Sequence, residues 1–271
     1  MKRLVDEVPT RVKEKLAWWV LRSRARGAGF DRGGLRRVEE YLRVSLELQE
    51  PRYTHPLQRP RHYFPGLTAK PWHDRTEFTW VALLEDAHEV IEEELAHIQS
   101  RLLPQPQGLA DSGRWNIYYF YSLGRKVEEN CLRCPETARV IDSLSGLSST
   151  GLAYFSVLTP GTHIKPHCGP TNTRLRCHLG LDVPPTCQIR VGSETRSWEK
   201  GKCLIFDDSF EHEVRNSADE TRTVLVLDFW HPDLTAAEVW ALRQIMRVST
   251  KARKFDRSVR RNSRSATATY S

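Results

Sequence analysis

The sequence lacks a long apolar run. The longest one near the N-terminus extends from Leu16 to Leu21, whereas a membrane-spanning helix needs roughly 20 apolar residues. Lys2 and Arg3 precede Asp6 and Glu7, which stand where a secretory signal would have its apolar region. These absences predict a cytoplasmic protein without transmembrane anchoring.

Cysteine is also scarce, with six residues in 271, and Cys131 and Cys134 form the single CxxC pair. A structural zinc site needs a second pair of ligands at comparably close spacing, which the sequence does not supply. A local disulfide and two free thiols both remain open for this pair.

No low-complexity tract or internal repeat occurs, and the composition is that of a globular protein, with 28% charged residues and eight Trp. The 41 Lys and Arg exceed the 34 Asp and Glu by seven. This basic excess gathers at the ends, in Arg22 to Arg37 and Lys251 to Arg264. Such runs usually form solvated faces or tails, so we expect no nucleic-acid partner and leave a peripheral membrane contact open.

Hydrophobic periodicity divides the chain. A helical pattern over residues 12–48 predicts an N-terminal helical extension at 1–50, and the segment rich in Pro, His and aromatic residues at 51–75 predicts an extended strap. An amphipathic helix is expected from Ala87 to Leu103, and another after Pro232 and Asp233. Residues 251–271 are expected to be a basic, disordered tail, which leaves 51–250 as the main domain.

From Trp115 onward the period changes to two. Short runs rich in β-branched and aromatic residues alternate with turn residues and show no intervening helices, which favours an antiparallel sandwich or barrel. The runs are Asn116 to Leu123, Leu152 to Leu158, Arg174 to Leu181, Cys187 to Val191, Lys202 to Asp207 and Thr221 to Trp230.

Strand alternation places unusual polar residues on one face. Arg174, Arg176 and His178 point the same way, and in the last run Arg222 shares a face with Asp228. Cations inside a small barrel are costly unless an anion binds them, so the pattern predicts a site for a ligand that carries a carboxylate.

Two loops near these strands carry histidines. Residues 160–170 contain His167, residues 206–214 contain His212, and Arg222 follows His212 by ten residues. An imidazole from each loop would form a two-histidine site for Fe, Zn, Cu or Ni.

This arrangement resembles the jelly-roll Fe(II)/2-oxoglutarate oxygenases, and more narrowly the aspartyl/asparaginyl β-hydroxylase family. The resemblance covers about residues 60 to 235. It rests on His167 to Asn172, Arg174 to Leu181, Trp198 to Lys202, Phe206 to Glu213 and Trp230 to Pro232. The implied fold is mainly β, a double-stranded β-helix (jelly-roll) core with α-helices at its N- and C-terminal sides.

The resemblance implies that His167 and His212 ligate iron. Gly169 stands where related oxygenases have a carboxylate ligand, and Asp208 matches an acid that holds a metal-bound water.

The resemblance also assigns the cofactor-binding and substrate-binding residues. Ser156 and Arg222 match the pair that binds the distal carboxylate of 2-oxoglutarate, and His178 and Arg176 match groups near its chelating end. Arg174 and Arg176 are then available for a substrate carboxylate.

The implied activity is that of a dioxygenase which uses Fe(II), 2-oxoglutarate and dioxygen to hydroxylate an unactivated C–H. The expected substrate is the β-carbon of an aspartyl or asparaginyl residue in an acidic peptide, or a related aspartyl small molecule. The alternatives are hydroxylation of a lipid acyl chain and a non-catalytic jelly-roll module that binds an acidic ligand. Oligomeric state and stereochemistry are not indicated by the sequence.

Overall fold

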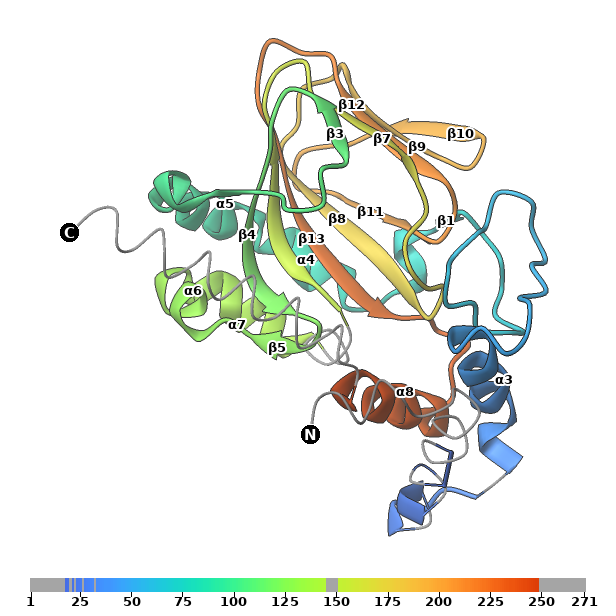
Figure 1. The fold of residues 1–271 in the computed structure, drawn as a ribbon. Helices are drawn as coiled ribbons and strands as arrows, with labels where there is room; N and C mark the ends of the chain where they lie inside the picture. Colours follow the sequence, from blue (N-terminus) through green and yellow to red (C-terminus); the bar gives the residue numbers. More distant parts are fainter. Residues whose placement is uncertain are drawn as a thin grey trace, which may run out of the picture.

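The computed structural model describes residues 18–19, 21, 23–25, 27–31, 33–144 and 151–248, with side chains to 246. The predicted tail at 251–271 and most of the predicted helical region before residue 33 lie outside the described residues. Within the remainder, two antiparallel sheets stand face to face, with helices on the outer side of the larger sheet and below both (Figure 1).

Eight strands form the jelly roll. The larger sheet contains the order β11-β8-β13-β6 and the smaller one the order β10-β9-β12-β7, so that the chain crosses between sheets at almost every connection. The strands are β6 (Ala153–Leu158), β7 (His163–His167), β8 (Arg174–Asp182), β9 (Cys187–Val191), β10 (Glu194–Ser197), β11 (Cys203–Phe206), β12 (His212–Asn216) and β13 (Arg222–Trp230). This topology confirms the predicted double-stranded β-helix.

Five further strands extend the two sheets. In the larger sheet β1 (Trp72–His73) pairs with β11, β4 (Trp115–Ser122) pairs with β6, and β2 (Leu103–Pro104) and β5 (Arg125–Lys126) pair with β4. In the smaller sheet β3 (Ala110–Ser112) pairs with β7.

Helices flank the β core (Figure 1). One group covers the larger sheet and consists of α4 (Val81–Asp86), α5 (His88–His97), α6 (Glu128–Arg133) and α7 (Pro135–Ser143). A second group consists of α3 (Arg36–Ser45) and α8 (Ala236–Val248), and single turns are η1 (Gly33–Leu35), η2 (Arg75–Glu77) and η3 (Gln99–Arg101). None of the helices in the described ranges combines the length and apolar character needed to span a bilayer.

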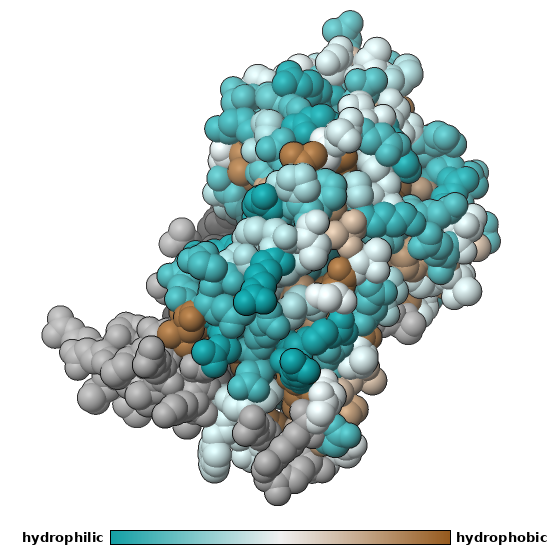
Figure 2. Space-filling model, turned by 90° about the vertical axis from the view of Figure 1, so that its right-hand side faces the viewer, coloured by the Kyte–Doolittle hydropathy of each residue, from teal (hydrophilic) through white to brown (hydrophobic). Residues whose placement is uncertain are grey.

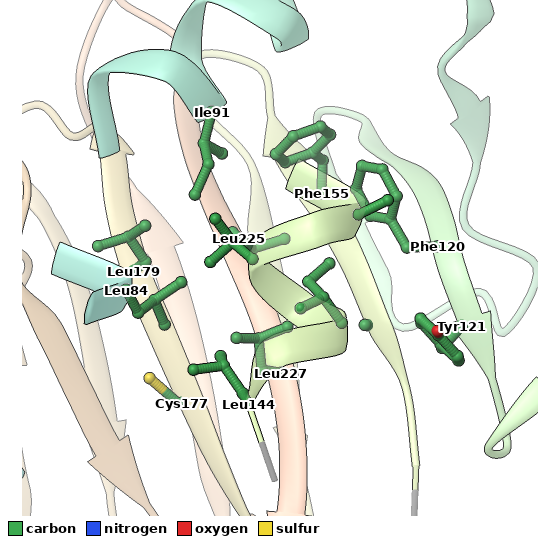
Figure 3. Packing of buried hydrophobic residues seen from close by; sticks show 14 of the residues in the cluster. Leu84, Ile91, Phe120, Tyr121, Leu144, Phe155, Cys177, Leu179, Leu225 and Leu227 are labelled. Atoms are coloured by element: carbon green, nitrogen blue, oxygen red, sulfur yellow. The ribbon is translucent and has the colours of Figure 1, made fainter. Parts of the chain in front are cut away.

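The larger sheet has two buried faces. Leu225 and Leu227 of β13 and Leu179 of β8 point toward the helices, where they pack with Leu84 and Ile91 (Figure 3). The intervening residues of the same strands point between the sheets, where Val224 and Val226 meet Ile189 and Val191 of β9. Alternation therefore buries an apolar set on one side and reserves the other side for the inter-sheet space that also holds the polar residues.

The molecular surface that Figure 2 shows is mostly polar, in contrast to the buried faces of the sheets. In Figure 2 the surface around the strap and β10 is mostly hydrophilic, and apolar residues appear as small separate spots. Scattered apolar residues of this kind are ordinary for a soluble surface.

Three parts of the sequence prediction were wrong in detail. His167 and His212 lie on strands β7 and β12 and not in loops. Helices α6 and α7 interrupt the strands between β5 and β6, where no helix was expected. The helix predicted from Ala87 to Leu103 ends at His97 and is followed by η3.

The physical reasons are local. Pro166 within β7 cannot donate to a ladder, which makes the segment resemble a loop. In β12 the charged Glu213 and Arg215 alternate with buried residues over only five positions. Such short strands give a weak periodic signal.

An ion pair joins the N-terminal and C-terminal helices. The Arg37 guanidinium donates from Nε and Nη2 to the two carboxylate oxygens of Glu238 at 2.7 and 2.6 Å. The same guanidinium donates to the carbonyls of Gly66 and Asp233. Glu238 also accepts the backbone N–H of Thr235, whose hydroxyl accepts the N–H of Glu238, so that it forms the capping box of α8.

We predict that Arg37→Ala lowers the free energy of unfolding by about 2 kcal/mol, because it leaves a buried carboxylate without its cation. Denaturant unfolding monitored by circular dichroism measures this change. Arg139→Ala is the control, since its partner Glu136 is 45% exposed and such surface pairs contribute less than about 1 kcal/mol. Equal effects of the two variants would contradict the assigned role of Arg37.

Candidate active site

Two histidines lie side by side on neighbouring strands of the smaller sheet. His212 at the start of β12 is the direct cross-strand partner of His167 at the end of β7, and the ring centroids lie 4.2 Å apart. Nδ1 of His167 lies 2.7 Å from the carbonyl of Lys165, and Nδ1 of His212 lies 2.9 Å from that of Phe210. Each Nδ1 therefore carries the proton, which leaves the lone pair on Nε2 available to a metal.

Electrostatics keeps both rings neutral. Burial lowers the pKa of His212 well below its ordinary value, and His167 lowers it further. Burial also lowers the pKa of His167, and Arg176 acts in the same direction. Neutral imidazole is the form that ligates metals, so the pair is ready for one at neutral pH.

Asp208 fills the place of a side chain at position 169. A Cβ added to Gly169 would lie 2.5 Å from Cγ of Asp208 and 2.6 Å from both carboxylate oxygens. The backbone N–H of Gly169 also donates to the carbonyl of Asp208. The carboxylate beside the histidines thus comes from the turn before β12, and glycine at 169 makes room for it.

A chain of ion pairs runs from Asp208 into the larger sheet. Nη1 of Arg176 lies 3.0 Å from Oδ2 of Asp208, and Nε of Arg176 donates to Oδ1 of Asp228 at 2.8 Å. Nη1 of Arg174 lies 3.4 Å from the other oxygen of Asp228. Burial raises the pKa of Asp208 although Arg176 opposes the shift, whereas burial of Asp228 is outweighed by Arg176 and Arg174, which lower its pKa.

Arg222 is a buried cation with a different environment. Its residue is 1% exposed, and Nη1 lies 3.3 Å from both the carbonyl and the hydroxyl of Ser156. Its Cζ lies 4.9 Å from the ring centroid of Trp198. Within the described ranges no carboxylate forms an ion pair with it, and burial lowers its pKa. An unpaired guanidinium at this depth predicts an anionic ligand.

Further donors without partners surround Arg222. His178 stacks on Trp198 with ring centroids 5.9 Å apart, and burial together with Arg222 lowers its pKa well below the ordinary value. In the described part of the chain, Nδ1 of His178, Nε1 of Trp198 and Nε of Arg222 are buried without a hydrogen-bond partner. Buried polar atoms are rarely left unpaired, so these three atoms indicate a site for a polar ligand.

These distances change one step of the sequence argument. Arg174 and Arg176 were expected to be unpaired inside the barrel, but Asp228 and Asp208 neutralise them. Of Arg174, Arg176 and Arg222, only Arg222 has no carboxylate partner among the described residues, so it alone indicates an anionic ligand. Their predicted contact with a substrate carboxylate must therefore use the N–H groups that the two aspartates leave unoccupied.

Asp228 was predicted on the same strand face as Arg222 but without a role. Its contact with Arg176 depends on the register of β13 and β8, in which the two residues are cross-strand neighbours, and the sequence alone does not supply this register. Trp115 was also missed as a site residue. Its Nε1 donates to the hydroxyl of Ser156 at 3.0 Å and so fixes the group that faces Arg222.

The strap holds both histidine segments together. His62 donates its backbone N–H to Pro170, three residues after His167, and Arg59 donates to Ser209, three residues before His212. Glu211 in turn donates to Leu57. The extended segment predicted at 51–75 thus binds the segments that follow β7 and precede β12.

The CxxC pair lies apart from these residues. Cys131 and Cys134 are buried free thiols, in α6 and at its junction with α7. Burial raises their pKa values to about 11 and about 12. Over the described ranges, no three His, Cys, Asp or Glu side chains form a group that could hold a metal ion.

The fold and the paired histidines define a jelly-roll protein with a two-histidine site, and comparison with known proteins extends this. A profile of the aspartyl/asparaginyl beta-hydroxylase family matches residues 80–232. A mouse protein named aspartyl/asparaginyl beta-hydroxylase is 40% identical over 188 residues, which are 66% of this chain and 25% of that protein. The chain belongs to the aspartyl/asparaginyl β-hydroxylase family of hydroxylases.

Other relatives cover more of the chain. Aspartate beta-hydroxylase domain-containing protein 2 of Xenopus tropicalis is 37% identical over 232 residues, which are 81% of this chain and 60% of that protein. The chain therefore spans between a quarter and about 60% of the length of these relatives. A solved prolyl-4-hydroxylase of Pseudomonas putida shares 16% identity and a TM-score of 0.36 over 56% of this chain and 98% of that one.

We predict that Gly169→Ala weakens anaerobic Fe(II) binding at least about tenfold, because the new Cβ must displace the Asp208 carboxylate from Arg176. Isothermal titration measures the affinity. Gly27→Ala is the control, since no atom lies within 4 Å of its added Cβ. Unchanged Fe(II) affinity in Gly169→Ala would show that the place of Asp208 does not matter for the metal.

Proposed function

We propose that the protein is an Fe(II)/2-oxoglutarate-dependent dioxygenase that hydroxylates the β-carbon of an aspartyl or asparaginyl residue in an acidic peptide or a related amino-acid substrate. The observation that carries this proposal is that successive ring contacts through Phe206, His178 and Trp198 connect the histidine pair to the buried Arg222. Residues 51–250 would form the oxygenase domain.

The donor set fits Fe(II). Two neutral imidazoles with free Nε2 atoms suit a first-row transition metal, and they leave its other coordination positions to a chelating cosubstrate and dioxygen. His167 and His212 would hold the iron. Asp208 would act next to it, through a bound water, since its carboxylate stands where residue 169 would project.

The groups around Arg222 fit the distal carboxylate of 2-oxoglutarate. Arg222 would supply the positive charge, and the Ser156 hydroxyl, oriented by Trp115, would supply a second contact. His178 and Arg176 lie toward His212 and Asp208 and would face the chelating end. When bound, iron with 2-oxoglutarate and dioxygen supplies the oxidising power that hydroxylates an unactivated C–H.

The chain's own contribution is to position the reactants and exclude water. Phe206 lies 5.0 Å from His178 and 5.8 Å from His212, centroid to centroid, and packs against Trp72. Arg174 and Arg176 would bind the side chain of the substrate residue and thereby set which C–H faces the metal. The reaction needs no general base, because the C–H bond would be broken by removal of a hydrogen atom and not of a proton.

We predict that anaerobic addition of Fe(II) and 2-oxoglutarate to the apoprotein produces the weak visible charge-transfer band of the bidentate chelate. The band should disappear in His212→Ala, because one imidazole cannot hold the metal. His97→Ala is the matched control, since His97 is exposed at the end of α5.

The outcome decides between the two classes of function. A band in wild type and His97→Ala alone supports the dioxygenase. Its absence from wild type would refute the catalytic proposal and favour a non-catalytic module that binds an acidic ligand.

We predict that Arg222→Met leaves thermal stability unchanged or raises it, but weakens cosubstrate binding. Removal of an unpaired buried guanidinium should leave the thermal midpoint no lower than that of wild type, because methionine can fill the space without a desolvation cost. Binding of 2-oxoglutarate, measured by calorimetry with Fe(II) present, should weaken at least about a hundredfold. A marked loss of stability with unchanged binding would mean that Arg222 is a structural residue.

A further inference from the structure

Asp228 stands between Arg174 and Arg176, the two arginines that are proposed to bind the substrate side chain. The residue is 2% exposed, and its two carboxylate oxygens meet different guanidinium groups, Oδ1 that of Arg176 and Oδ2 that of Arg174. Oδ2 also accepts the backbone N–H of Leu152 at 3.1 Å. Both oxygens are therefore engaged, and Asp228 is the shared counter-charge of the pair.

The backbone just before β6, at Gly151 and Leu152, fixes this carboxylate. A Cβ added to Gly151 would lie 2.4 Å from both Cβ and Oδ2 of Asp228 and 2.7 Å from Nη1 of Arg174. The chain passes so close that the carboxylate has no room to swing away. Asp228 is thus held in one position between Arg174 and Arg176.

The two arginines favour the ionised form of Asp228, because they lower its pKa against the effect of burial. Arg176 divides its N–H groups between Asp208 and Asp228, but Arg174 pairs with Asp228 alone among the described carboxylates. The positive charge that Arg174 and Arg176 show to a ligand therefore depends on Asp228.

We propose that Asp228 determines the charge selectivity of the substrate site. It neutralises one of two adjacent guanidinium groups, so that the pair recognises a side chain by hydrogen bonds and accepts both a carboxylate and an amide. This inference rests on the proposed function of Arg174 and Arg176 and assigns a specificity role to a residue that touches them and not the substrate.

The physical basis is the preference of a buried charge for its opposite. With both Asp228 and Asp208 ionised, the charges of Arg174, Arg176, Asp208 and Asp228 sum to zero, and a substrate carboxylate gains little over an amide of the same shape. Without Asp228 the pair has an excess positive charge in a buried place, which only an anion can compensate. Loss of the Asp228 charge should therefore favour aspartyl over asparaginyl ligands.

The test compares two peptides that differ only in an aspartyl or asparaginyl residue at one position. Calorimetry with the apoprotein of 271 residues gives the ratio of their dissociation constants, so the readout needs no turnover. In Asp228→Asn the preference for the aspartyl peptide should rise at least about tenfold over that of wild type. Arg174→Gln should lower it, and the double variant should return it to the wild-type ratio, because the net charge is restored.

The control removes a negative charge elsewhere. Asp142→Asn breaks a contact with Lys126 at a side chain that is 40% exposed, and it should leave the ratio unchanged. A purely structural Asp228 would weaken both peptides equally in Asp228→Asn, and this result would overturn the proposal. If Asp228→Asn does not fold, an Arg174→Gln ratio equal to that of wild type would overturn it.

The proposed function has a separate readout. A wild type that forms the charge-transfer band but binds neither peptide overturns the selectivity proposal and leaves the dioxygenase intact. Variants that show the predicted ratios, with a wild type that forms no band, support the selectivity role and refute the dioxygenase.

Discussion

The pairing of β12 with β7 is the constraint on which the rest of the site depends. This register sets His212 opposite His167, and in each case a carbonyl two residues earlier in the chain accepts a hydrogen bond from Nδ1. A slip of one residue would turn one imidazole to the other face of the sheet. The strap binds the segment after β7 and the one before β12, which secures the register from outside.

Charge is distributed unevenly inside the jelly roll. Toward one side, two arginines and two aspartates compensate each other over contacts of 2.8 to 3.4 Å. On the other side Arg222 lies beside Ser156, Cys187 and the ring of Trp198, and among the described residues no carboxylate forms an ion pair with it. Desolvation of a lone buried guanidinium costs free energy, and an anionic ligand that binds to it offsets this cost. This is the physical argument for an anionic cosubstrate.

The fold could be predicted from the sequence wherever alternation was strong. The strand at Cys187–Val191 was predicted with its observed bounds, and β8 and β13 to within a residue or two, because their apolar faces pack on helices. The family motifs also placed Ser156, His178 and Arg222 in one region, and the structure brings them together. The prediction failed where the periodic signal was weak, because α6 has only six residues and Pro166 interrupts the strand pattern of β7.

The pairing of the arginines could not be predicted, because an ion pair depends on cross-strand register. Asp228 and Arg176 are 52 residues apart and become neighbours only when β13 lies beside β8. Gly169 shows the same limit. The sequence indicates a missing carboxylate, but only the folded chain shows that Asp208 projects into that space.

The most direct measurement of the central claim follows the oxygen atom. Protein loaded with Fe(II) and 2-oxoglutarate is given labelled dioxygen and an aspartyl peptide, and both products are analysed by mass spectrometry. The account predicts one labelled oxygen atom in the peptide, on a β-carbon, and a second in succinate, in equal amounts. Succinate without any change in the peptides, amino acids or lipids offered would contradict the assigned substrate, and the absence of both products would contradict the catalytic site itself.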